Sequence, residues 1–126
     1  MSSRTPLARV RGLGSARSGT EHWWHQRLTA VANVPLILFL IWLGTQVAGG
    51  NHASVVTLIR HPIVALGLIL ALLNHGWHMK LGMQVVIEDY VHSRLANVAL
   101  LLGNIFLPAA VSLAGVLAVL TIVFGA

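Results

Sequence analysis

Two histidines and one tyrosine are the residues of this chain whose types and spacing could carry chemistry. His75 and His78 lie within an otherwise apolar stretch, and that stretch ends in Asp89 and Tyr90. Ionisable groups inside a membrane segment are costly, so they usually face a bundle interior, a cofactor or a pathway. We therefore expect the chemistry of this protein, if it has any, to be centred on this stretch.

The depth of His78 favours a bound partner. It lies nine residues before Ile87, or ~13 Å from that end of the span at 1.5 Å per residue. A neutral imidazole there needs a partner, and a heme iron is a suitable one. Gly82, one turn later, would let a flat macrocycle lie against the helix. His75 and His78 share roughly one face, so a second axial ligand should come from another subunit.

A purely structural interpretation of these residues stays open. His75 and His78 could simply hydrogen-bond to neighbouring helices, and spacing alone does not decide between this role and heme ligation. Asp89 and Tyr90 could be a helix end followed by an aromatic anchor, which the physics alone favours. A phenol beside a carboxylate at the membrane edge could equally hydrogen-bond a quinone carbonyl and supply protons. Lys80 should point at a partner chain or extend to the membrane surface.

The composition indicates that lipid is the solvent for much of this chain. Of its 126 residues, 56% are hydrophobic and only 9% are charged, and the mean hydropathy is +0.81. The absence of cysteine excludes disulfides, iron–sulfur clusters and thiolate zinc sites ligated by this chain. The net charge of +5 is concentrated near the N-terminus. Orientation and anionic lipid head groups explain it better than nucleic acid does.

The hydrophobic pattern predicts an all-α, integral membrane bundle of three transmembrane helices. Residues 1–27 form a polar, basic arm that ends in a tryptophan and histidine cluster suited to a membrane interface. Residues 28–126 form the anchor, with spans at about 28–47, 62–87 and 97–126. Each is long enough to cross ~30 Å of hydrocarbon.

The segments between and within the spans carry further expectations. Residues 48–60 are predicted to be a short polar connection, and residues 88–94 a tight charged turn. Pro35 should kink the first span. The third span carries alanines at four-residue spacing, which would let another helix approach closely; these are Ala110, Ala114 and Ala118.

The basic residues predict the orientation. Four arginines lie in the arm and Arg27 lies at the membrane edge, so the N-terminus should be cytoplasmic. Three spans then place the turn at residues 88–94 in the cytoplasm and the C-terminus in the periplasm. Arg60, on the outer side, is a mild exception. Arg27 and the pair Asp89 and Tyr90 should thus lie at one face of a bacterial inner membrane.

The spacing of four of these residues resembles a known motif. His78-x3-Gly82-x6-Asp89-Tyr90 is similar to the motif of the D-type hydrophobic anchor subunit of succinate dehydrogenase, respiratory complex II. In that family the histidine is an axial ligand of heme b, and Asp-Tyr follows it by eleven and twelve positions. The resemblance implies that His78 binds the heme iron, that Gly82 packs on the heme, that Tyr90 binds ubiquinone and that Asp89 supports the ubiquinone site.

The resemblance extends to the start of the first span. The segment Arg27-Leu28-Thr29-Ala30 fits the family's arginine, which implies a place for Arg27 near a heme propionate or the quinone. The larger C-type anchor carries a Ser-x-x-His-Arg segment before its first span, which this chain lacks. His75 is not part of the family pattern.

The resemblance also implies a function and partners. The chain would be a membrane anchor of succinate:ubiquinone oxidoreductase with no complete active site of its own. It would share heme b with a cytochrome b-type C anchor and help hold the iron–sulfur and flavoprotein subunits to the bilayer. The alternatives are a fumarate reductase anchor and a cofactor-free structural or assembly protein of the membrane.

Overall fold

The chain is helical throughout the part that its computed structural model describes, which is residues 5–12 and 18–125. The helices are α1 (Pro6–Val10), α2 (Ser18–Gly49), α3 (His52–Arg60), α4 (Pro62–Tyr90) and α5 (Arg94–Phe124). Within these ranges there is no strand. Three helices, α2, α4 and α5, are long and apolar enough to cross a membrane. The prediction of an all-α protein with three spans is confirmed. Of the arginines in the predicted basic arm, Arg4 and Arg17 lie outside the described residues.

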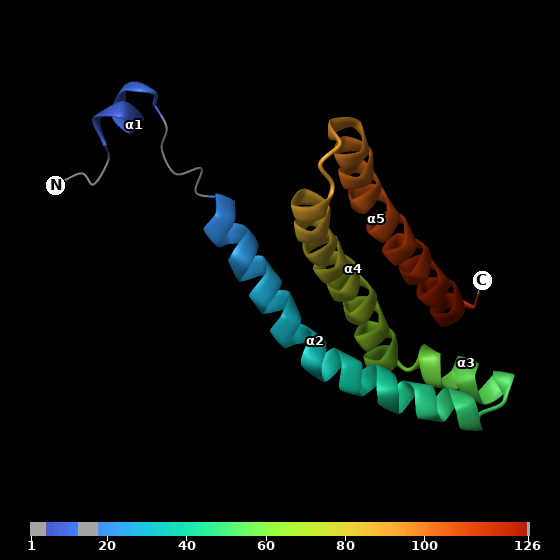
Figure 1. Ribbon diagram of the computed structural model, residues 1–126. Coiled ribbons are helices and arrows are strands. Elements are labelled where there is room, and N and C mark those ends of the chain that lie inside the picture. The colour runs from blue at the N-terminus through green and yellow to red at the C-terminus, as the bar shows by residue number, and fades with distance from the viewer. Residues whose placement is uncertain (1–4, 13–17, 126) are drawn as a thin grey trace.

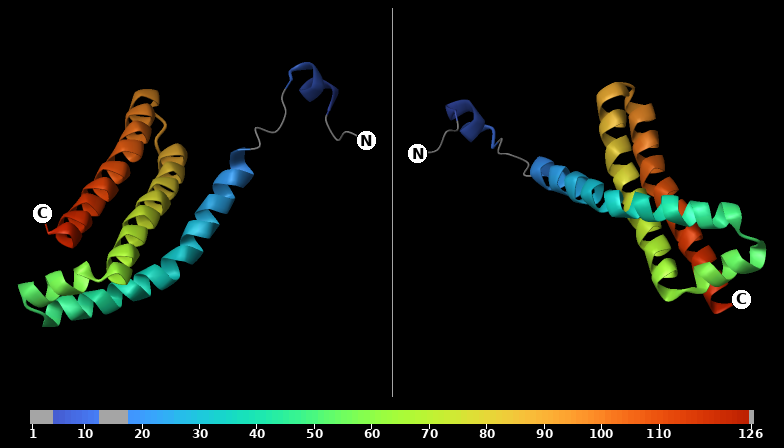
Figure 2. Two further views of the ribbon diagram at one scale, coloured as in Figure 1. Left: turned by 180° about the vertical axis from the view of Figure 1, so that it is seen from behind. Right: turned by 90° about the horizontal axis from the view of Figure 1, so that it is seen from below.

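The helix α4 is at the centre of the arrangement. It packs against the antiparallel α5 on one side and against α2 on the other, and α2 crosses it obliquely (Figures 1 and 2). The first half of α2 diverges from α4 (Figure 1). The start of α2 and the α4–α5 turn lie at one end of the molecule, and α3 and the C-terminus lie at the other.

Most apolar side chains face outward. Only seven hydrophobic residues of the described part are buried, and large exposed ones are found along all three long helices. A membrane protein needs internal hydrogen bonds for its backbone, which the helices supply, but it does not need to bury apolar side chains. The surface is therefore the one expected if lipid surrounds the helices.

The first long helix is longer than the predicted span. It begins at Ser18 rather than near residue 28, since nothing between Ser18 and the apolar run breaks a helix and Glu21 favours the first turn. The apolar run marks where lipid contact begins, which is not where the helix begins. The ribbon bends near its middle (Figure 1), where Pro35 lies inside the helix, as expected.

The segment 48–60 contains the short helix α3, where the sequence predicted only a connection. The side chain of Asn51 caps its first turn by accepting a hydrogen bond from the Ser54 amide at 2.9 Å. Pro62 ends it, because a residue before proline avoids the helical conformation. Arg60 donates from Nε to the carbonyl of Ile122 at 2.9 Å, and a cation is favourable at that C-terminus of α5. This contact gives Arg60 a structural role at the predicted outer end.

The charged turn is also shorter than predicted. The helix α4 continues through Asp89 to Tyr90, and α5 begins at Arg94. Asn97 accounts for the tightness, since its Nδ2 donates to the carbonyls of Ile87 at 3.2 Å and Val91 at 3.1 Å. The acidic residues and the tyrosine thus lie on the last turn of α4.

Small residues bring α4 and α5 together. A side chain at Gly76 would collide with Ser112, whose hydroxyl donates to the Leu72 carbonyl at 3.0 Å. Close approach of this kind is how membrane helices associate. The predicted alanine stripe does not take part; its members are exposed on the outside of α5: Ala110, Ala114 and Ala118.

Candidate functional site

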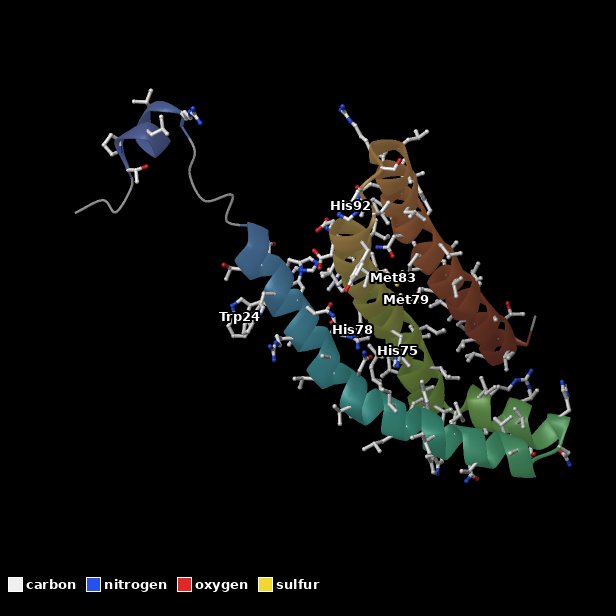
Figure 3. All side chains as sticks on the ribbon, viewed as in Figure 1. Trp24, His75, His78, Met79, Met83 and His92 are labelled. Atoms are coloured by element: carbon white, nitrogen blue, oxygen red, sulfur yellow. The ribbon has the colours of Figure 1, made fainter. Side chains whose placement is uncertain are left out.

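His78 is held between α4 and α2. Its Nδ1 lies 2.9 Å from the hydroxyl oxygen of Thr29, and the side chain extends from α4 toward α2 (Figure 3). His78 is half-buried, as is Thr29. The bond joins residues 49 positions apart in the chain, so the crossing of the two helices creates the site.

The hydroxyl of Thr29 lies close to two carbonyls of its own helix as well as to Nδ1 of His78. That hydroxyl has a single hydrogen, and it lies 2.8 Å from the carbonyl of His25 and 3.1 Å from that of Gln26 on its own helix. Once the hydrogen is donated there, Thr29 can only accept from His78. With that hydrogen on a carbonyl of α2, the 2.9 Å contact fits an Nδ1–H of His78 that donates to Thr29, and Nε2 then keeps its lone pair. A metal-binding imidazole has this arrangement, with one ring N–H donated to an outer partner.

Asparagines extend this contact toward the middle of the helices. Nδ2 of Asn74 donates to the carbonyl of Thr29 at 3.0 Å and to Oδ1 of Asn33 at 2.7 Å. The sequence interpretation missed this pair of asparagines beside the contact of Thr29 with His78. The signal was present as two polar pairs at four-residue spacing, Thr29 with Asn33 and Asn74 with His78. Each pair occupies one helix face.

His75 has different surroundings from His78. Its Nδ1 lies 2.8 Å from the carbonyl of Ala71 on its own helix. The ring lines an apolar groove of about 230 Å³ between α2, α4 and α5, together with residues such as Leu40, Leu68 and Val111. The two histidines therefore meet different neighbours, although they were expected to share roughly one face.

The other histidines of the described chain lie toward the two ends of the molecule. They are His22 and His25 near the start of α2, His52 and His61 around α3, and His92 in the α4–α5 turn. Of these, His25 packs edge-on against Trp77, with ring centroids 6.4 Å apart. None of them hydrogen-bonds to His78 within the described part of the chain.

Gly82 faces α2 one turn beyond His78. A methyl group added there would meet only Nε2 of Gln26, at 3.7 Å, which is an ordinary contact. Packing within the described chain therefore does not require glycine at this position. Beside it, Oε1 of Gln26 and Nε2 of His22 are buried atoms with no hydrogen-bond partner among the described residues. Such atoms are costly to bury, so this end of the α2–α4 interface is suited to a polar group from outside the chain.

The predicted cation Arg27 is exposed beside the aromatic cluster of α2. Its guanidinium carbon lies 5.0 Å from the centre of the Trp23 ring, within the range of a cation–π contact. No ion pair joins it to Asp89 in the part of the chain that is described. Lys80 makes a similar contact, with Nζ 4.8 Å from the Trp77 ring.

Tyr90 lies on the surface of the last turn of α4. Its side chain is 77% exposed at the end of α4, and neither it nor Asp89 makes a hydrogen bond to another described residue. The neighbouring Glu88 accepts from Nε2 of Gln84 at 2.9 Å. The phenol and the carboxylate are thus free to contact another molecule at this end of the bundle. The structure does not bring them together with His78, which lies three turns earlier on the same helix.

The comparisons with known proteins agree on one family. Residues 1–124 match the family described as succinate dehydrogenase/fumarate reductase transmembrane subunit. The succinate dehydrogenase hydrophobic membrane anchor subunit of Rickettsia bellii (strain RML369-C) is 32% identical over 104 residues, which are 82% of this chain and 83% of that protein.

Two further proteins are similar to this chain. The succinate dehydrogenase membrane anchor subunit of Reclinomonas americana is 32% identical over 87 residues, 65% of this chain and 71% of that protein. The hydrophobic membrane anchor subunit of Paracoccus denitrificans is 28% identical over 102 residues, 81% of this chain and 79% of that protein. No solved structure matches.

Proposed function

Because this chain belongs to the family of succinate dehydrogenase/fumarate reductase transmembrane subunits, we propose that it binds heme b through His78 and contributes to ubiquinone reduction. The predicted membership of the succinate dehydrogenase anchor family is confirmed. The curated relatives support a membrane anchor subunit of succinate dehydrogenase, and such an anchor works with the other subunits of the complex in a lipid bilayer. The three apolar helices make it a multi-pass membrane protein.

The observation that carries the heme proposal is the 2.9 Å contact between Thr29 and Nδ1 of His78. When Nδ1–H is donated to Thr29, Nε2 of His78 keeps a lone pair. The ring is half-buried within an apolar span. The unpartnered buried atoms of His22 and Gln26 fit a group that carries polar substituents. Gly82, beside them, would take the packing role on the heme that the family resemblance implies. Heme b supplies a one-electron redox centre when bound. The second axial ligand would come from a cytochrome b-type C anchor subunit.

The proposed quinone contacts are at the end of α4. The exposed phenol of Tyr90 can donate a hydrogen bond to a quinone carbonyl oxygen without adding charge in a low-dielectric place. Asp89, next to it and near the water boundary, would orient the site or pass protons to it. Two-electron reduction of the quinone consumes two protons, so a group of this kind is needed there. The iron–sulfur subunit would dock at this end, and the flavoprotein subunit would bind through it.

Arg27 would provide a fixed positive charge near a heme propionate or the quinone. We expect Arg27→Lys to keep the charge and the topology but to lose the planar fork of donors. If the substitution lowers the stabilisation of the reduced heme relative to the oxidised heme by about 1 kcal/mol, the reduction potential of the heme falls by roughly 40 mV. Potentiometric titration of the purified complex measures this.

The matched control for Arg27 is Arg94→Lys. Arg94 begins α5 at the same end of the molecule and makes no hydrogen bond or ion pair to the other described residues. Arg94→Lys should leave the reduction potential of the heme unchanged. Equal potentials and equal quinone kinetics in wild type and Arg27→Lys would mean that Arg27 only sets the membrane orientation.

The proposed orientation places the N-terminus and the α4–α5 turn in the cytoplasm of a bacterium and the C-terminus in the periplasm. Arg27 and Arg94, at the end of the molecule where α2 begins, support this orientation. The positive charge of Arg60 lies at the opposite end, and the hydrogen bond of Arg60 to the carbonyl of Ile122 in α5 gives it a structural role there. We expect alkaline phosphatase fused after Ala126 to be active, and the same reporter inserted after His92 to be inactive. The opposite pattern would separate Tyr90 from the soluble subunits.

A cofactor-free structural role is the rival proposal. The contact with Thr29 supports it in part, because it gives His78 one hydrogen-bond partner without any cofactor. The difference spectrum of the reduced and oxidised complex, purified through a tag on this chain, separates the two. A b-type heme signal is expected, in a fixed molar ratio to the protein of the complex. A pure complex without that signal would leave the histidines with packing roles alone.

A further inference from the structure

The two asparagines between α2 and α4 have a role of their own. We propose that Asn74 and Asn33 form a positioning lock, defined here as these two side chains, that sets the orientation of the His78 ring through Thr29. Nδ2 of Asn74 uses one hydrogen on Oδ1 of Asn33 at 2.7 Å and the other on the carbonyl of Thr29 at 3.0 Å. This proposal rests on the proposed function of His78 as a heme ligand.

The apolar surroundings of Asn33 and Asn74 favour the persistence of the hydrogen bonds of the lock. Asn33 is 8% exposed and Asn74 is half-buried, both within helices that are apolar enough to cross a membrane. An amide that loses its partner in such surroundings finds no water to replace it. Hydrogen bonds between membrane helices therefore hold the two surfaces in one register.

The lock also lies beside Pro35, where α2 lacks a backbone hydrogen bond. Pro35 has no N–H to donate to the carbonyl of Val31 four residues earlier, so the helix can bend there. Asn74 contacts the turn just before this point at both ends, through the backbone of Thr29 and the side chain of Asn33. The direction in which the first half of α2 leaves the bend is thus fixed by α4 as well as by α2 itself.

The same turn carries the hydroxyl that faces His78. Asn74 and His78 are four residues apart on α4, and Thr29 and Asn33 are four apart on α2, so the four side chains form two adjacent rungs between the helices. If the Asn74 rung is removed, the Thr29 rung can shift. A shift of Thr29 rotates the imidazole and weakens its Nδ1 hydrogen bond, which are the properties that an outer partner controls.

The test is Asn74→Leu in the purified complex. Leucine has a similar size and cannot hydrogen-bond. We expect heme to transfer to apomyoglobin about tenfold faster than from wild type, the lower end of the effect of losing an outer partner of a metal ligand. The low-spin electron paramagnetic resonance signal should shift as well. Subunit assembly and succinate oxidation by an artificial acceptor should not change.

The matched control is Asn104→Leu. Asn104 donates from Nδ2 to the carbonyl of Lys80 at 2.8 Å, so it also joins a neighbouring helix to α4 but has no link to Thr29. It should change neither heme measurement. The double variant Asn33→Leu/Asn74→Leu should release heme no faster than Asn74→Leu alone, because residues that act as a unit are not additive.

Each outcome either supports or overturns the lock. An equal effect of Asn74→Leu and Asn104→Leu would make it ordinary helix packing, and unchanged heme release in Asn74→Leu would refute it. If Asn74→Leu does not assemble, Asn33→Ala retains the bond of Asn74 to Thr29 and should show a smaller change in the same direction; no change there overturns the lock. If His78→Ala keeps its heme, the proposed function fails first, whereas loss of heme in His78→Ala with unchanged Asn74→Leu refutes only the lock.

Discussion

The replacement His78→Ala is expected to lower the heme b content of the purified complex by at least about tenfold. On the proposed assignment the variant would remove the iron ligand itself, and even the loss of an outer partner costs about 10- to 100-fold in metal affinity. On the proposed assignment the other axial ligand would belong to another subunit, and it alone would not hold the iron as the pair of ligands does. The heme-to-protein ratio from the difference spectrum measures the effect.

His75→Ala is the control for this result. It removes an imidazole three positions earlier on α4, one whose Nδ1 contacts the Ala71 carbonyl and whose ring lines the apolar groove. It should leave the heme signal largely intact. A signal that survives His78→Ala and disappears in His75→Ala would reverse the assignment, and a signal that survives both would exclude this chain as the source of a ligand.

Tyr90→Phe is expected to lower succinate-dependent ubiquinone reduction by roughly ten- to hundredfold at low quinone concentration. On the proposed assignment the change would remove one hydrogen bond to the quinone, which is worth on the order of 1–3 kcal/mol. The ring is 77% exposed and makes no contact that the fold needs. Assembly and heme content should therefore remain normal, which the subunit ratio and the difference spectrum report.

Oxidation of succinate by an artificial acceptor is the control for Tyr90. It bypasses the quinone and should fall little in the variant. If both activities fall together, Tyr90 holds the complex together instead of contacting the quinone. If neither falls, the ring is only an anchor at the membrane interface, and the quinone site must lie in the partner subunits.

The long helices and the motif on α4 were predictable because each is a local property of the sequence. Hydropathy over about 20 residues identifies a span, and the spacing from His78 to Asp89 and Tyr90 is read along one helix. The ends of the helices were less predictable. The last turn of α4 continues through charged residues to Tyr90 because Asn97 satisfies the carbonyls there, and a charge count does not reveal that bond.

Contacts between distant segments were the part that could not be predicted. The bond between Thr29 and His78, like that between Arg60 and Ile122, depends on the crossing of helices more than forty residues apart in sequence. Polar pairs at four-residue spacing on α2 and α4 indicate that such bonds are possible, but not which pair meets which. The outward position of Ala114 has the same cause, because small residues permit a close approach but do not choose the partner helix.

The most direct test of the account is a density map of the intact complex around α4. We predict a heme with its iron coordinated by Nε2 of His78, with Nδ1 of the same ring within hydrogen-bonding distance of the Thr29 hydroxyl and the second axial ligand from a partner subunit. Iron coordinated by His75, or density in which α2 and α4 meet as described with no heme beside His78, would contradict it.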